Sequence, residues 1–434
     1  MQSIWHEHCN RINFPTLKSN LRTDVLVIGG GMAGILCAHK LNSLGIDCIL
    51  IEQDKLLSGV TQNTTAKITA QHNLIYTKIY KKYGIEAAKL YLQANLSAVQ
   101  EYKELGKKIE CDMVDSTSYV YSEKNTNLLE KERDILGQIG YETSIKIADE
   151  LPFENASALG FINQAQFNPL KFAYGISKEL KIYENTRAEE ISEKFVRTNY
   201  GKIEADHIII ATHFPLIDRH GLYFLKMYQQ RSYVIAVKNI GELNGMYIDE
   251  KPNGFSFRSY RDTLLIGGGG HRTGERGGGY HAIERFIKEN YPTAKEVTRF
   301  ATQDCITLDE MPYIGRYFKR SKSLYVVTGF NKWGMTSSML ASNLLADIIM
   351  GNSSEYEKLF SPNRSILHFQ TLKNTCKTVK NLVTPTVPRC SHLGCALKYN
   401  KQEKSWDCPC HGSRFNEKLE VINNPASKDI KEKK

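Results

Sequence analysis

The segment DVLVIGGGMAG at residues 24–34 places the tightest restriction on the fold of this 434-residue chain. Four β-favouring apolar residues run into Gly29, Gly31 and Gly34, and a helical pattern of apolar residues follows. Gly29 permits a tight turn, Gly31 lets a pyrophosphate approach the backbone, and Gly34 allows helix and strand to pack closely. A second apolar run ends in Glu52, whose carboxylate can accept hydrogen bonds from ribose hydroxyls. This order of elements predicts an α/β, Rossmann-like dinucleotide-binding domain.

Two later segments favour FAD as the dinucleotide, although the glycine motif alone does not separate FAD from NAD. Residues 58–72, SGVTQNTTAKITAQH, place Gly59 and Thr61 just past the ribose strand, where a ribityl chain would pass. Residues 324–351 begin as an apolar strand, continue through a glycine-bearing turn and become helical near Gly334. We therefore expect Gly59 and Thr61 among the cofactor-binding residues.

In these segments the chain resembles the FAD-dependent oxidoreductase family of D-amino-acid oxidase, glycine oxidase and sarcosine oxidase. The matching motifs include HIIIAT (207–212), DEMPYIG (309–315) and GFNKWGMT (329–336). The resemblance implies an antiparallel-sheet substrate domain within about residues 75–300. It also implies that the helix N-terminus after the last motif points at the flavin, where its partial positive charge stabilises the reduced form. The residues carried over for this contact are Gly329, Gly334, Met335 and Thr336.

Two departures from the family pattern concern the substrate and the cofactor. The amino-acid oxidases keep an arginine five residues before the position of Asp309, and this chain has Asp304 there. Because a carboxylate would repel a substrate carboxylate, we expect an amine or another cationic substrate. Sarcosine oxidases attach flavin through a cysteine seven residues before the same position, which is Thr302 here, so we expect non-covalent FAD. Cys305 lies at the wrong offset, and we interpret it as a core thiol.

The middle of the chain supplies candidate substrate contacts but no catalytic residue that we can name. Arg231, Tyr233, Tyr247 and His271 could face the substrate, although a structural role is the favoured interpretation for each. The glycines between residues 267 and 279 predict a flexible loop that could act as a lid.

Composition and apolar patterning are those of an ordinary soluble protein. No apolar run reaches the ~18–20 residues of a membrane helix, and the N-terminus lacks the pattern of a secretory signal, so we expect a cytoplasmic location without a membrane span. From residue 364 onward, Lys and Arg outnumber Asp and Glu by 14 to 6, which fits a solvated tail or an acidic partner. Basic and aromatic residues are not interleaved, so nucleic-acid binding is not expected.

Near the C-terminus, six potential metal or sulfur ligands lie within 22 residues, in the segments RCSHLGC and WDCPCHGSRF. A structural zinc site would use two cysteines and two histidines but leave two cysteines unexplained. A disulfide alone would leave the histidines without a role, and a ferredoxin cluster needs four cysteines at other spacings. A Rieske [2Fe–2S] centre takes two thiolates on one iron and two imidazoles on the other.

These segments resemble the Rieske proteins of respiratory cytochrome bc complexes, which share the pattern CxHLGC followed by CPCHGS. The resemblance implies four cluster ligands and a disulfide between the two ligand loops. The ligands are Cys390 and Cys408 on one iron and His392 and His411 on the other, and the disulfide joins Cys395 and Cys410.

The module around these residues departs from the Rieske pattern in two ways. Ser413 keeps a hydroxyl that bonds to the cluster in high-potential members, but Phe415 replaces the tyrosine that supplies a second hydroxyl, so we expect a potential below the respiratory range. The early strands of a complete Rieske domain are also missing. We therefore expect a small, shortened all-β module at residues 385–434, after an FAD-dependent domain at 1–362 and a linker at 363–384.

The sequence thus predicts an FAD-dependent oxidoreductase that oxidises an amine-like substrate and passes electrons through a Rieske cluster to an unknown redox partner. A plain FAD oxidase with a cluster-free, vestigial tail is one alternative. A non-catalytic FAD- or zinc-binding interaction protein is another. No D-x-x-H-x-x-x-H run is present, which argues against a ring-hydroxylating oxygenase.

Overall fold

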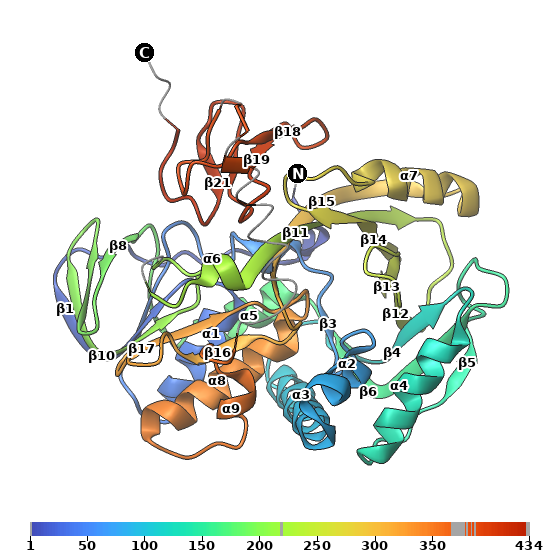
Figure 1. The fold of residues 1–434 in the computed structure, drawn as a ribbon, viewed down its shortest axis with the longest axis horizontal. Helices are drawn as coiled ribbons and strands as arrows, with labels where there is room; N and C mark the ends of the chain where they lie inside the picture. The colour runs from blue at the N-terminus through green and yellow to red at the C-terminus, as the bar shows by residue number, and fades with distance from the viewer. Residues whose placement is uncertain are drawn as a thin grey trace.

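The structure is a computed structural model and describes residues 2–217, 220–365, 378, 381–382, 384–385 and 388–430. Figure 1 shows two large β-sheets with helices packed against them and a small third sheet beside them. Most of the predicted linker at 363–384 lies outside the described residues. Within the described part of the chain, no helix is long and apolar enough to cross a membrane.

The first sheet has the strand order β16-β17-β10-β1-β2-β7 and is parallel except at its β16 edge, with β8 and β9 attached beside β10. Val25 and Val27 of β1 belong to the core that contains α1 and α8, whereas Leu26 and Ile28 belong to the core on the opposite face. Burial on both faces explains the uninterrupted apolar run. The strands are β1 (Leu21–Ile28), β2 (Cys48–Ile51), β7 (Lys181–Tyr183), β8 (Ala188–Ile191), β9 (Phe195–Thr198), β10 (Lys202–Ile210), β16 (Tyr313–Arg316) and β17 (Leu324–Thr328).

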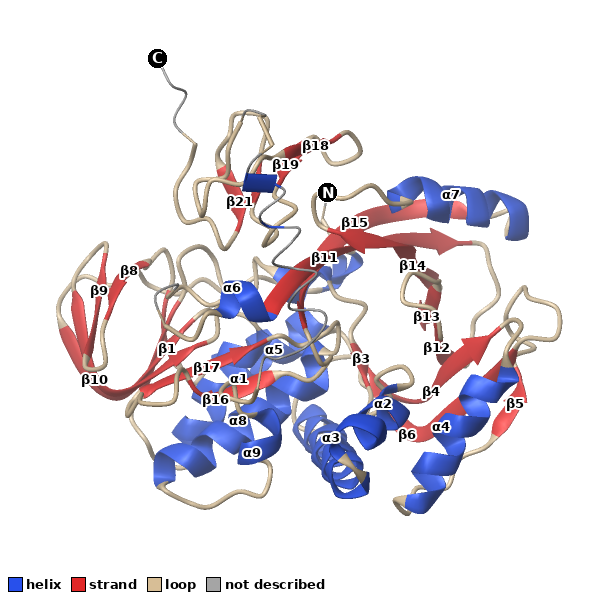
Figure 2. Ribbon diagram, in the orientation of Figure 1, coloured by secondary structure: helices blue, strands red, loops and turns tan. Residues whose placement is uncertain are grey.

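Helices gather on one side of this sheet and around the second one (Figure 2). The predicted helices after the two glycine motifs are both confirmed, and the two helices pack against each other in one core. The helices are α1 (Met32–Ser43), α2 (Ile75–Tyr83), α3 (Ile85–Gly106), α4 (Thr126–Gln138), α5 (Pro169–Ser177), α6 (Tyr223–Lys226), α7 (Gly279–Asn290), α8 (Gly334–Met350) and α9 (Glu357–Phe360), with 3-10 turns at Ile4–His8 and Val60–Asn63.

The second sheet has the order β15-β11-β14-β13-β12-β4-β6-β3, with β5 attached to β6. Its pairs are antiparallel except for β12 with β4, so the predicted antiparallel-sheet domain is confirmed. The strands are β3 (Lys67–Ile68), β4 (Val114–Ser122), β5 (Ile145–Ile147), β6 (Ser157–Gln166), β11 (Met227–Lys238), β12 (Gly245–Asp249), β13 (Ser256–Tyr260), β14 (Thr263–Arg272) and β15 (Lys295–Thr307).

The glycine-rich stretch at 267–279 is not a continuous loop, and this prediction was wrong. Its first residues belong to β14, and its last one starts α7. A Cβ at Gly269 would lie 2.1 Å from the Gly279 carbonyl oxygen, and a Cβ at Gly268 would lie 2.7 Å from the Phe255 ring. These glycines therefore allow close packing of α7 on the sheet.

The C-terminal module is the small all-β unit that the sequence predicts. Its sheet has the order β18-β19-β20-β21 and pairs antiparallel throughout. The module lies against β11 and β15 (Figure 1). Its strands are β18 (Lys398–Asn400), β19 (Ser405–Asp407), β20 (Arg414–Phe415) and β21 (Val421–Asn423).

Candidate cofactor cavity and cluster site

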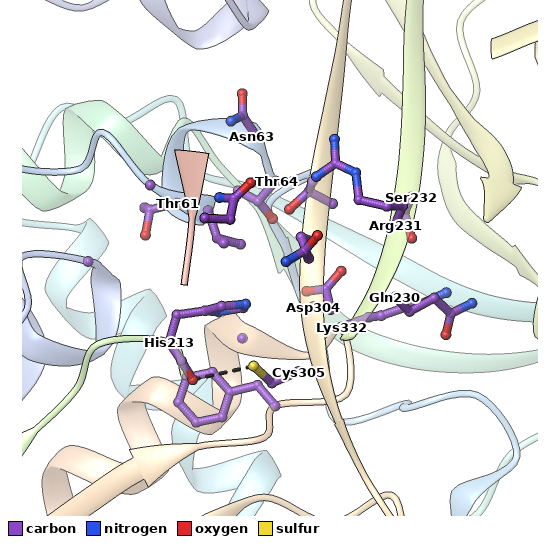
Figure 3. Close-up of a pocket in the computed structure, with 18 of the residues that line it drawn as sticks. Thr61, Asn63, Thr64, His213, Gln230, Arg231, Ser232, Asp304, Cys305 and Lys332 are labelled. Carbon is purple, nitrogen blue, oxygen red and sulfur yellow. Dashed lines mark hydrogen bonds between the residues drawn. The ribbon is translucent and has the colours of Figure 1, made fainter. Parts of the chain in front are cut away.

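One large cavity of about 1920 Å³ lies between the two large sheets and extends to the C-terminal module. This volume exceeds the roughly 300–1,000 Å³ of a pocket for one small ligand, so it can take an extended dinucleotide together with a substrate. Figure 3 shows part of its lining, with Asp304 and Lys332 near Gln230, and Thr61 and Asn63 on the opposite side.

The first glycine motif forms the cradle that the sequence predicts. Gly29 has φ +113°, and a Cβ there would lie 2.6 Å from the Ala211 carbonyl oxygen. A Cβ on Gly34 would lie 1.9 Å from the Gly29 carbonyl oxygen, so α1 packs on β1 without room for a side chain. Gly31 is different, because its Cβ would meet only the Thr61 hydroxyl, at 3.4 Å. Gly31 thus leaves backbone accessible at the N-terminus of α1, as a pyrophosphate requires.

The predicted ribose and ribityl contacts lie on the same stretch of wall. Glu52 follows β2 and accepts hydrogen bonds from the backbone N–H of Gly30 (2.7 Å) and Asp54 (2.9 Å). Burial raises the pKa of Glu52. The Thr61 hydroxyl accepts from the Met32 N–H at 3.0 Å, next to Gly59 in the cavity wall.

The turn before α8 contributes Gly329, Gly334 and Met335 to the cavity wall. Thr336 is buried and does not line the cavity. Its hydroxyl donates to the Thr69 carbonyl oxygen at 3.2 Å. It also lies 2.9 Å from Nε2 of His72, a cavity residue that no sequence pattern marked. Burial lowers the pKa of His72 to about 3, so the imidazole is neutral.

Buried polar atoms in the cavity wall bear on which ligand the cavity fits. In the described part of the chain, the hydroxyls of Ser232 and Thr302 and the Nε2 atom of His213 have no hydrogen-bond partner. Buried polar atoms are costly unless they are paired. The cradle and these orphaned atoms together fit a bound FAD. Cys305 is buried as predicted, and its thiol donates to the His213 carbonyl oxygen at 3.5 Å.

Charged groups share this lining. Burial raises the pKa of Asp304 to about 6, while the charges of Lys332 and Arg231 act in the opposite direction. Burial lowers the pKa of Lys67 to about 7, and its ammonium donates to the Tyr247 carbonyl oxygen at 3.0 Å. Asp304 therefore gives the cavity an anionic group near neutral pH.

The four candidate substrate contacts have structural partners, as the favoured interpretation predicts. Arg231 pairs with Glu403 of the C-terminal module, with Nε 3.0 Å from Oε2. The Tyr233 hydroxyl donates to the same carboxylate at 2.9 Å and lies 2.9 Å from Nε2 of His271. Tyr247 donates its hydroxyl to Glu150 at 2.9 Å. Arg231 and Tyr233 also line the cavity.

The six ligand candidates of the C-terminal segments lie close together, with the four cysteines and His411 buried and His392 partly exposed. Cys395 and Cys410 form a disulfide that joins the two loops. The rings of His392 and His411 have centroids 5.2 Å apart. A hydrogen bond with Cys408 lowers the pKa of Cys390, against the effect of burial. Two adjacent thiols beside two adjacent imidazoles match the donor set of a Rieske [2Fe–2S] cluster.

Comparisons with known proteins agree with both sites. The sequence profile of the family "FAD dependent oxidoreductase" matches residues 24–348, and that of the "Rieske [2Fe-2S] domain" matches residues 376–434. YhfW of Bacillus subtilis (strain 168), named as a Rieske 2Fe-2S iron-sulfur protein, is 30% identical over 99% of this chain and 97% of its own length. Gamma-glutamylputrescine oxidoreductase of Escherichia coli (strain K12) is 24% identical over 79% of this chain and 87% of its own.

Among solved structures, glycine oxidase from Geobacillus kaustophilus superposes with a TM-score of 0.68. The match covers 80% of this chain and 100% of that one at 19% identity, so it supports the fold of the first domain.

Proposed function

Because the chain belongs to the FAD-dependent oxidoreductase family and ends in a Rieske [2Fe–2S] domain, we propose that it oxidises an amine and passes the electrons to an external redox partner. Bound FAD supplies a two-electron oxidant, and a bound cluster supplies a one-electron carrier. Fusion of the two domains in one chain supports a relay between them. The cytoplasmic location belongs to the same proposal and rests on the free, mostly buried thiols outside the cluster site.

The position of Asp304 is the main support for an amine substrate. Its side chain is a carboxylate in the cavity wall, on β15, close to the turn that precedes α8 (Figure 3). A cationic ammonium gains a charge-assisted hydrogen bond there, while a substrate carboxylate would be repelled. The name of gamma-glutamylputrescine oxidoreductase points to an amine-bearing substrate, whereas glycine, in the name of the structural neighbour, also carries a carboxylate.

The other predicted site residues would hold FAD and the iron–sulfur cluster. Gly29, Gly31, Glu52 and Thr61 would hold the dinucleotide half of FAD without a covalent bond, and Thr302 offers a hydroxyl where a covalent link would need a thiol. The ligands expected for the cluster are Cys390, His392, Cys408 and His411.

An anaerobic amine screen tests the proposal. Purified protein is mixed with monoamines, diamines and amino acids without oxygen, and loss of the oxidised flavin absorbance is followed. Primary or secondary amines should bleach the flavin, and simple α-amino acids should react more slowly. Iron and sulfide on the same sample should give about two irons per chain. Reaction with α-amino acids alone would contradict the amine proposal, and zinc in place of iron would contradict the relay.

A further inference from the structure

Strands β11 and β15 contribute to the cavity wall and also contact the C-terminal module. Tyr228 and Gln230 of β11 line the cavity, as do residues 231–234 further along the strand. The residue between the first two, Gln229, is buried and contacts the module instead. Side chains alternate between the two faces at residues 228–230, so this end of β11 contacts both the cavity and the module.

Two buried glutamines hold the second ligand loop of the module, residues 408–412, against β11 and β15. The Gln229 amide donates to the carbonyl oxygens of His411 and Asn424, both at 2.9 Å. The Gln303 amide donates to the Gly412 carbonyl oxygen at 2.9 Å. Arg272 adds bonds to the carbonyl oxygens of Pro409 (3.3 Å) and Cys410 (3.0 Å), in the same loop.

A buried ion-pair cluster holds the other end of the module. The side chains of Arg231 and Glu403 are 4% and 11% exposed, and Arg414 of β20 lies 3.1 Å from the same carboxylate. Arg414 also pairs with Asp407 at 2.9 Å. Removing one partner would leave a charge buried without compensation, which is costly.

The module itself contributes to the cavity wall beside the first glycine motif. Residues 421–424 and 426–429 are among the lining residues. The Asn424 amide donates to the carbonyl oxygens of Thr212 (2.8 Å) and Phe214 (3.1 Å). The cradle is adjacent, because a Cβ on Gly29 would lie 3.2 Å from the Thr212 nitrogen.

We propose that the iron–sulfur module is a structural part of the FAD site. Segment 421–429 closes the cavity next to the first glycine motif, and Gln229, Gln303 and the Arg231–Glu403 pair keep it closed. FAD therefore leaves the protein faster when the module is undocked. This role concerns retention of the cofactor and does not depend on the identity of the substrate.

The test uses the FAD-loaded full chain and two variants in the contacts that hold the module; Gln229 is not a lining residue, whereas Glu403 lines the cavity from the module side. Gln229→Glu keeps the shape but turns the donor into a carboxylate facing two carbonyl oxygens. Glu403→Gln removes the negative charge from the buried ion-pair cluster. Gln138→Glu, at the exposed end of α4, is the matched control. Hydrogen exchange at residues 408–412 reports undocking, and the fluorescence of released flavin after dilution reports loss of FAD.

Both variants should raise exchange at the loop and release FAD about tenfold faster, because a lost charge-assisted or buried hydrogen bond has an effect of this order. The control should match the natural chain. Faster exchange with unchanged FAD release in either variant would overturn the proposal. Unchanged exchange in both variants would also overturn it, because these contacts would then not hold the module. Neither readout involves an amine, so failure of the proposed oxidation would be seen separately.

Discussion

Asp304 places a partly buried carboxylate in the wall of the FAD cavity, and the ammonium of Lys332 lies in the same wall. The carboxylate is ionised above its pKa of about 6 and neutral below it. The KM for a cationic amine should therefore fall as the pH rises through about 6. Asp304→Asn should remove this dependence and raise KM by about tenfold or more, the effect of a lost charged hydrogen bond.

Steady-state kinetics over a pH series measure this effect. Asp262→Asn, an exposed aspartate that pairs with Lys238 on the surface, is the control and should behave like the natural chain. The same pH profile in Asp304→Asn would mean that another group binds the amine.

Phe415 is the second residue with a measurable consequence. It is fully buried in the core of the module, beside the ligand cysteines. Phe415→Tyr should restore a hydroxyl donor to the cluster and raise its midpoint potential by about 50 mV, since one hydrogen bond of about 1 kcal/mol acts on a one-electron couple. A redox titration followed by EPR measures the shift, and an unchanged or lower potential would contradict the assigned environment.

Among the helices and strands, sequence patterns predicted those elements whose signals lie within one continuous segment of the chain. The β1–α1–β2 unit and α8 could be predicted because glycines and apolar periodicity lie within a few residues of each other. β14 was mistaken for a loop because its glycines reflect close packing by α7, a contact with no local signal. The contact of Gln229 with His411 could not be predicted from the sequence either, because 182 residues separate the two.

The disulfide between Cys395 and Cys410 makes a prediction about the two ligand loops. Its closed loop of 15 residues corresponds to about 3 kcal/mol of chain entropy. Replacing both cysteines with serine should lower the unfolding temperature of the module, followed by its cluster absorbance. Cys9→Ser is the control, and equal stability of the module with and without the disulfide would contradict its structural role.

At the scale of the whole molecule, the two domains share one wall, so electron transfer between them should need no domain movement. After photochemical reduction of the flavin, the rate of cluster reduction should be the same in buffer and in glycerol. Reaction with an added external acceptor should slow down in glycerol, because it is diffusional. A parallel slowing of both reactions would show that the module must move before it accepts an electron.

The relay from amine to cluster is the central claim, and one measurement tests it most directly. The amine that bleaches the flavin is added without oxygen to the iron-loaded protein, with no other reductant, and the sample is examined by EPR. If the relay operates, the signal of a reduced Rieske cluster appears together with loss of the oxidised flavin absorbance. Flavin bleaching without that signal, in protein containing about two irons per chain, would contradict it.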